Sequence, residues 1–138
     1  MAEAIGEAKR GLAAALASIE GLRVYDYEPD GVHEFPAAIV RLESREPVET
    51  LGGGAVRGSM RVEVLAPITD ARQADETLGA FLEPQGALSI EAAATADRTW
   101  GGTVDDARLV RVDNIGKRKV GGVQCLGADF CFWFVRGE

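Results

Sequence analysis

The segment over residues 123–135 constrains the fold most, because it has strand character and is apolar on both of its faces. Side chains alternate between the two faces of a strand. The alternation predicts one face with Phe130, Phe132 and Phe134 and another with Cys131, Trp133 and Val135. In a two-layer domain only one face of an antiparallel sheet packs against helices. The second face is therefore expected to be covered by another copy of the chain or by a partner.

The size and charge of the chain exclude several classes of protein. At 138 residues the chain is expected to form one domain over residues 1–138. A net charge of -7 argues against a dedicated nucleic-acid binder, because such proteins are usually basic. No apolar stretch approaches the roughly 20 residues that cross a bilayer, so no membrane partner is expected.

Hydrophobic periodicity predicts two to three helices. The first covers residues 2–20, the second is capped by Thr69 or Asp70 and runs to about Leu82, and a short third, which Ser89 can cap, covers residues 90–96. Between and after these helices, alternation predicts strands. The predicted strands are residues 22–27, 36–42 and 56–65, and a long C-terminal hairpin that pairs 103–114 with 123–135 across a tip at 116–122.

The order of these elements predicts the α+β class: a mostly antiparallel sheet of about five strands with the helices packed on one face. Residues 43–55 break the pattern and contain Gly52-Gly53-Gly54, so they are predicted to form a flexible loop or arm.

Residues with chemical potential are few and scattered. Cys125 and Cys131 would lie about 20 Å apart on one strand, too far for a disulfide, and are expected to be free thiols. His33 has no second histidine or cysteine near it in the sequence, and the neighbouring acids Asp105 and Asp106 would point to opposite faces of a strand. The chain is therefore expected not to be an enzyme and to have no catalytic, cofactor-binding or metal site.

The glycine-rich stretch before the third strand invites a phosphate-loop interpretation. Ser59 stands where such a loop requires lysine, and the stretch enters a strand rather than a helix, so a nucleotide site is not expected. The one basic cluster is Lys117, Arg118 and Lys119. It is interpreted either as a hairpin tip that contacts DNA phosphate or an acidic partner, or as a charged tip that keeps the protein soluble. Three charges support only weak, salt-sensitive binding.

Several segments together resemble a known family. They are Gly21 to Tyr27, Pro29-Asp30-Gly31-Val32, Phe35 to Val40, Leu78 to Gly86, Trp100-Gly101-Gly102-Thr103-Val104 and Gly121 to Phe130. In these segments the chain is similar to the tail terminator, or tail completion, proteins of long-tailed, siphovirus-like phages. Trp100 stands where the family usually has leucine or a similar residue, and the loop over residues 43–55 has no counterpart that we can place.

The resemblance implies a structural protein of the virion, at the head-proximal end of the tail and assembled in the host cytoplasm. Its subunits are expected to form a ring, a hexamer by this resemblance, that caps the tail tube, ends its polymerisation and joins it to the head-tail connector. The implied partners are the chain itself, the tail tube protein, the head-tail connector or stopper protein, and genomic DNA that passes through the lumen without sequence-specific binding. An acidic lumen would let DNA slide without sticking.

For the subunit interface we expect Phe130, Phe132, Trp133 and Phe134, helped by the loop over residues 43–55. Three alternatives remain open. The chain could be another neck component, such as a head-tail stopper or adaptor. It could instead be a cytosolic small-molecule-binding module or enzyme, or a DNA-binding module that uses Lys117 to Lys119.

Overall fold

The computed structural model describes residues 4–47 and 55–137. Within these ranges the chain forms three helices and five strands. In chain order they are α1 (Ala4–Leu16), β1 (Arg23–Tyr25), β2 (Ala37–Pro47), β3 (Val56–Pro67), α2 (Ala71–Leu82), α3 (Ile90–Thr95), β4 (Asp106–Val120) and β5 (Val123–Arg136).

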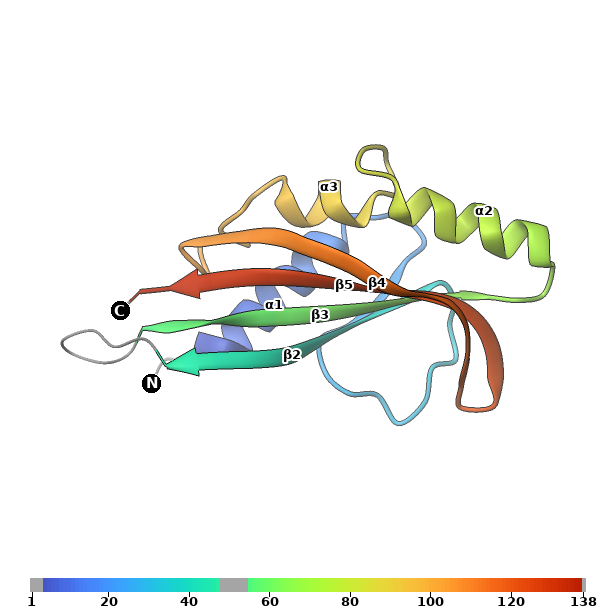
Figure 1. The fold of residues 1–138 in the computed structure, drawn as a ribbon, viewed down its shortest axis with the longest axis horizontal. Helices are drawn as coiled ribbons and strands as arrows, with labels where there is room; N and C mark the ends of the chain where they lie inside the picture. The colour runs from blue at the N-terminus through green and yellow to red at the C-terminus, as the bar shows by residue number, and fades with distance from the viewer. Residues whose placement is uncertain (1–3, 48–54, 138) are drawn as a thin grey trace.

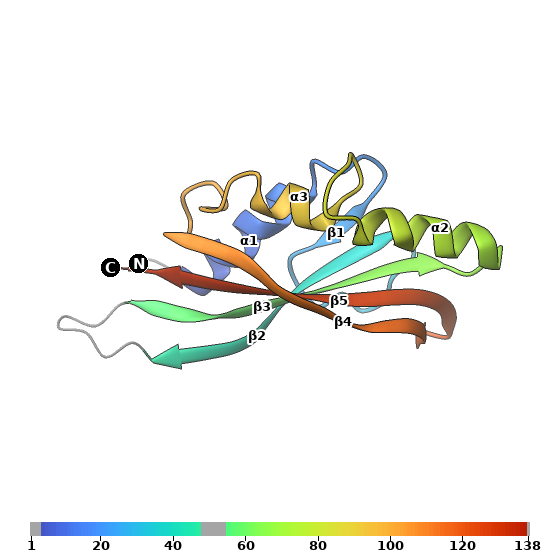
Figure 2. The ribbon, with the colours of Figure 1, turned by 45° about the horizontal axis from the view of Figure 1, so that its top comes forward.

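The strands form a single twisted sheet in the order β1-β2-β3-β5-β4, in which Figure 1 labels β2, β3, β5 and β4 and Figure 2 also labels β1. β1 runs parallel to β2, and the other neighbours are antiparallel. Figure 2 shows the three helices on one side of this sheet, while the other side has no helix over it. The predicted α+β class, with helices on one face and a long C-terminal hairpin, is confirmed.

The helices form where the sequence supplies an apolar stripe and a cap. The buried stripe of α2 is Ala74, Leu78 and Phe81, and the side chain of Asp70 accepts hydrogen bonds from the backbone at the start of the helix. Ser89 caps α3 in the same way, with Ala92 N donating to its Oγ at 3.0 Å. These caps satisfy backbone N–H groups that have no partner inside the helix.

The main core lies between the helices and the sheet, and β5 supplies its largest side chains. Phe130, Phe132 and Phe134 are each at most 1% exposed. The indole of Trp100 packs against the last two rings, with centroids 6.3 Å and 6.1 Å away, and its Nε1 donates to Ala94 O at 3.0 Å. Each buried phenylalanine contributes roughly 1.5–3 kcal/mol by leaving water.

This packing corrects the expectation that Phe130, Phe132 and Phe134 form a subunit interface. The helices of the same chain already bury the three rings, so they have no surface left for a neighbour. Trp133 points to the opposite face, where it is partly exposed, and its assignment to an interface stays a prediction.

Several boundaries differ from the sequence prediction. The first helix ends at Leu16 rather than at residue 20, the first strand is only Arg23–Tyr25, and β4 begins at Asp106 rather than at residue 103. β2 continues through Glu43 to Pro47, because these residues pair with the start of β3; Ser44 Oγ lies 2.8 Å from Ser59 Oγ, and Arg57 binds Glu46 at 2.9 Å. The predicted flexible loop was therefore wrong for residues 43–47, and residues 48–54, including Gly52-Gly53-Gly54, lie outside the described residues.

The hairpin is also longer than predicted. The chain turns at Gly121-Gly122, whose φ values of 57° and 84° suit a two-residue hairpin turn, and Val120 pairs with Val123. Gly116 lies inside β4, opposite Gly127 and directly after an irregularity in the pairing. Lys117, Arg118 and Lys119 therefore belong to a strand and do not form the tip.

Candidate functional site: the open face of the sheet

The face of the sheet opposite the helices, here called the open face, gathers charged side chains from four strands. Strand alternation places Arg41 of β2, Arg61 and Glu63 of β3, and Asp129 of β5 on this face. Arg118 of β4 reaches the same region from the edge of the sheet. These charges are close neighbours in the fold, although they are far apart in the sequence.

Asp129 is the most buried member, with only 7% of the residue exposed. Its carboxylate accepts hydrogen bonds from Arg61 at 2.9 Å, from Asn114 at 2.9 Å and from Arg118 at 3.0 Å. Burial opposes ionisation, but the bonds from Asn114, Arg118 and Arg61 outweigh it, so the pKa of Asp129 is lowered. Asp129 is therefore held as a carboxylate at neutral pH.

Glu63 connects this carboxylate to a second arginine. It accepts from Arg118 Nη1 at 2.8 Å through one oxygen and from Arg41 Nη1 at 2.7 Å through the other. Arg41 also donates to Glu28 at 2.6 Å and 2.8 Å. Glu28, together with Glu63, raises the pKa of Arg41. The result is a continuous chain of ion pairs across β2, β3, β5 and β4.

Glu43 of β2 extends this network to the side of Arg61 that faces away from Glu63. It accepts from Arg61 Nε at 2.7 Å and from Cys131 Sγ at 2.9 Å, and Arg111 lies 3.7 Å away. The bond from the thiol, followed by those from Arg61 and Ser59, outweighs burial and lowers the pKa of Glu43 to about 2. Burial, and then the carboxylate itself, raises the pKa of Cys131.

The two ends of the open face are covered differently. At one end, a small apolar cluster containing Tyr25, Val32, Ile39, Leu65 and Cys125 is completed by Phe35 and by Val120 of the hairpin. At the other end, the guanidinium of Arg108 lies 4.9 Å from the ring centroid of Trp133. The chain therefore buries Cys125 and Cys131 on its second sheet face with its own side chains, so these two residues do not need the partner expected from the sequence.

This geometry offers a rigid polar surface and little reactive chemistry. Among the described residues every buried side-chain nitrogen or oxygen has a hydrogen-bond partner, and no group of three or more potential metal ligands is present. The carboxylates of Glu43, Glu63 and Asp129 each form an ion pair with at least one arginine. A saturated network of this kind is stiff, because each side chain is fixed by several others.

The structure separates the predicted basic cluster. Arg118 points into the network on the open face, while Lys117 and Lys119, one residue to either side, point to the helix side of the hairpin. Both lysines are exposed, and neither has an ion-pair partner in the part of the chain that the structure describes. The remaining candidates stay at the surface: His33 is exposed, and Asp106 pairs with Arg98 at 2.8 Å.

Sequence reasoning missed the ion-pair network. The available signal was the alternation Arg41, Glu43 in one strand and Arg61, Glu63 in the next, with Asp129 in an otherwise apolar strand. The alternation indicated a polar face, but the partner of each charge depends on strand order and register.

Two further findings bear on classification. In the described ranges, no helix is both long enough and apolar enough to cross a membrane. Comparison with known proteins found that no family model matches this chain and that no curated protein matches it significantly.

Proposed function

We propose that this protein is a structural subunit of a phage virion that forms a hexameric ring at the head-proximal end of a long tail. The ring would cap the tail tube, end its polymerisation and join it to the head-tail connector. The proposal is supported by the sequence resemblance and by a fold of the class that the resemblance implies. The observation that carries it is the open face, a sheet surface that has no helix over it and is rich in paired charges.

A ring that surrounds DNA needs an inner wall that does not bind the DNA and does not unfold. Helices on the outside and the open face on the inside would give such a wall, because the sheet is stiffened by its ion-pair network. Free lysines and arginines bind phosphate and release counterions. Here the arginines of the ion-pair network are already engaged by carboxylates, and Arg108 lies over the ring of Trp133, so DNA would pass without being held strongly.

This arrangement changes one expectation about the lumen. On the open face the arginines 41, 57, 61, 111 and 118 pair with the acids 43, 46, 63, 113 and 129, whereas Arg108 lies over the ring of Trp133. A lumen lined by this face would have nearly balanced positive and negative charges rather than an acidic surface. Paired charges, like an acidic surface, would leave few free cations to hold DNA.

The experiment that tests the function measures the mass of the purified protein in solution, alone and with the tail tube protein. Rings, alone or on the ends of tubes, would support the terminator function, and tubes should stop growing when the protein is added. A strict monomer that ignores tubes would contradict it. The same measurement with connector or stopper protein separates a terminator from another neck component.

The orientation of the ring wall has its own test. Glu46→Lys with Asp113→Lys adds free positive charge to the open face, at two partly exposed positions where folding should survive. We expect slower DNA ejection from phages that carry this variant. The control is Glu76→Lys with Glu83→Lys on the helix side, which makes the same change in net charge. Equal ejection rates for the two variants would sink the assignment of the open face to the lumen.

A further inference from the structure

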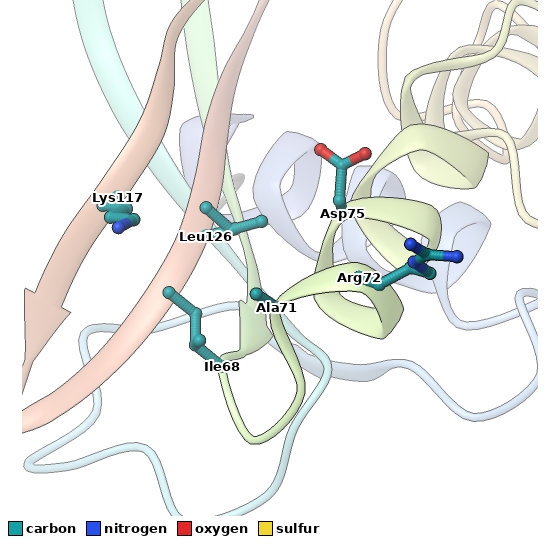
Figure 3. A pocket seen from close by; sticks show the side chains of 6 residues that line it. All are labelled: Ile68, Ala71, Arg72, Asp75, Lys117 and Leu126. Atoms are coloured by element: carbon teal, nitrogen blue, oxygen red, sulfur yellow. The ribbon is translucent and has the colours of Figure 1, made fainter.

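A groove lies on the helix side of the sheet, between the first turn of α2 and the hairpin (Figure 3). Its volume is about 520 Å³, and it is lined by Ile68, Ala71, Arg72, Asp75, Lys117 and Leu126. In Figure 3, Leu126 faces Ala71 and Ile68, so the floor of the groove is apolar. Lys117 stands at its hairpin side, and Lys119 lies two residues further along the same strand face.

A second surface of the chain has the complementary character. Residues 26–34, here called the acidic segment, contain Asp26, Glu28, Asp30 and Glu34 and no lysine or arginine. Tyr27 is 54% exposed, one of the most exposed large apolar side chains in the described residues. Its ring packs edge-on against Tyr25 at 5.8 Å.

The groove and the acidic segment lie at the same end of the sheet. Pairing aligns Ala37 with Leu65, Leu65 with Gly127 and Gly127 with Gly116, so these residues form one row across the sheet. The acidic segment directly precedes the β2 end of this row, and the outer part of the hairpin begins at its β4 end. The two surfaces are therefore level with one another along the strands, with the groove on the helix side and the acidic segment beside the apolar cluster of the open face, which includes its Val32.

We propose that the acidic segment of one copy of the chain docks on the groove of the next copy, with Tyr27 over Leu126 and Ala71 and the segment's acids beside Lys117 and Lys119. The contact joins two different surfaces, so it is heterologous, and repetition around an axis parallel to the strands closes a ring without a shift in level. An aromatic anchor with a charged surround is typical of protein interfaces. The inference rests on the proposed ring function and names the contact that builds the ring.

Charge reversal with complementation tests this contact. Variant A carries Lys117→Glu and Lys119→Glu, and variant B carries Asp26→Lys, Asp30→Lys and Glu34→Lys, which makes the segment basic because its remaining acid, Glu28, is paired with Arg41. Each variant alone places like charges on both surfaces, and we expect its self-association to weaken by roughly tenfold or more. An equimolar mixture restores opposite charges at every contact, so association should return in the mixture alone. Sedimentation velocity of each sample, with and without tail tube protein, measures the association. Tyr27→Ala removes the aromatic anchor without a change in charge and should also weaken association.

Several outcomes would overturn the contact. They are a wild-type chain that stays monomeric under both conditions, variants that associate like the wild type, and a mixture that stays dissociated while both variants remain folded by circular dichroism. The proposed function fails separately. Association that follows the charge pattern but leaves tail tubes uncapped would keep the contact and reject the function, whereas capping rings that ignore charge reversal would do the opposite.

Discussion

The carboxylate of Glu43 accepts a hydrogen bond from the thiol of Cys131, with Oε1 2.9 Å from Sγ. Glu43 is the residue at which the pairing of β2 with β3 shifts its register, between Leu42 and Ser44. The shift turns its side chain across β3 toward Cys131 of β5, and Arg61 of β3 binds the other carboxylate oxygen. A bulged residue in one strand thereby joins two other strands through its side chain.

The ion pair at Glu43 should make stability depend on acid. Its pKa is lowered from 4.5 to about 2, so the unfolded chain binds this proton first as the pH falls. The stabilisation is therefore present above pH 4.5 and is lost as the pH falls from 4.5 towards 2. We expect Glu43→Gln to reduce the free energy of unfolding by roughly 1–3 kcal/mol at pH 7, and by much less at pH 2.5.

Urea unfolding at the two pH values measures this effect. The control is Glu46→Gln on the same strand, whose carboxylate pairs with Arg57 but is 62% exposed. We expect that change to cost less than about 1 kcal/mol at either pH, because exposed pairs contribute little. Equal losses for the two variants would contradict the role given to Glu43.

Both cysteines should be inert in the folded protein. Burial raises the pKa of the Cys125 thiol and also that of the Cys131 thiol, and only the thiolate attacks a disulfide reagent. At pH 8 we expect Ellman's reagent to leave both thiols of the native protein unmodified and to titrate both in urea. Ala96→Cys, at an exposed position, is the positive control. Rapid stoichiometric labelling of native Cys125 or Cys131 would contradict this prediction and show that the side chains over that thiol move away in the folded protein.

The sequence was sufficient for the elements whose signals are local. The caps Asp70 and Ser89 and the apolar stripe of α2 each lie within a few residues, and they gave the starts of α2 and α3 correctly. The alternation in β3 likewise predicted its beginning at Val56.

The errors arose where long-range pairing decides the outcome. Glu43 to Pro47 has no strand pattern of its own and is strand because β3 pairs with it. The two apolar faces of β5 were recognised, but which face the helices cover depends on strand order. The sequence could not show that Arg61 and Glu43 would cover Cys131, because 18 residues separate the first two and 88 separate Glu43 from Cys131.

Neighbouring aromatic residues of β5 should respond differently to truncation. Phe132 is fully buried beneath the helices, so Phe132→Ala should cost about 3–5 kcal/mol and unfold much of the protein at 37 °C. Trp133 lies on the opposite face beside Arg108, and Trp133→Ala should cost only about 1 kcal/mol. If Trp133 also anchors a neighbouring subunit, its variant stays folded but sediments as a monomer. Thermal unfolding and sedimentation velocity separate the two effects, and a Trp133→Ala chain that unfolds would identify this residue as core.

The outer hairpin should depend on the absence of a side chain at Gly127. A β-carbon there would lie 2.5 Å from Nε of Arg118, whose guanidinium is fixed by Glu63 and Asp129. Gly127→Ala must displace Arg118 and leave the buried Asp129 and the partly buried Glu63 each short of one partner, so we expect a loss of about 1–3 kcal/mol. Gly79→Ala is the matched control, because it lies inside α2 with open space around it and should stabilise by about 0.5–1 kcal/mol. Urea unfolding of the two variants should therefore shift in opposite directions, and a neutral Gly127→Ala would mean that Arg118 contributes little to the position of the hairpin.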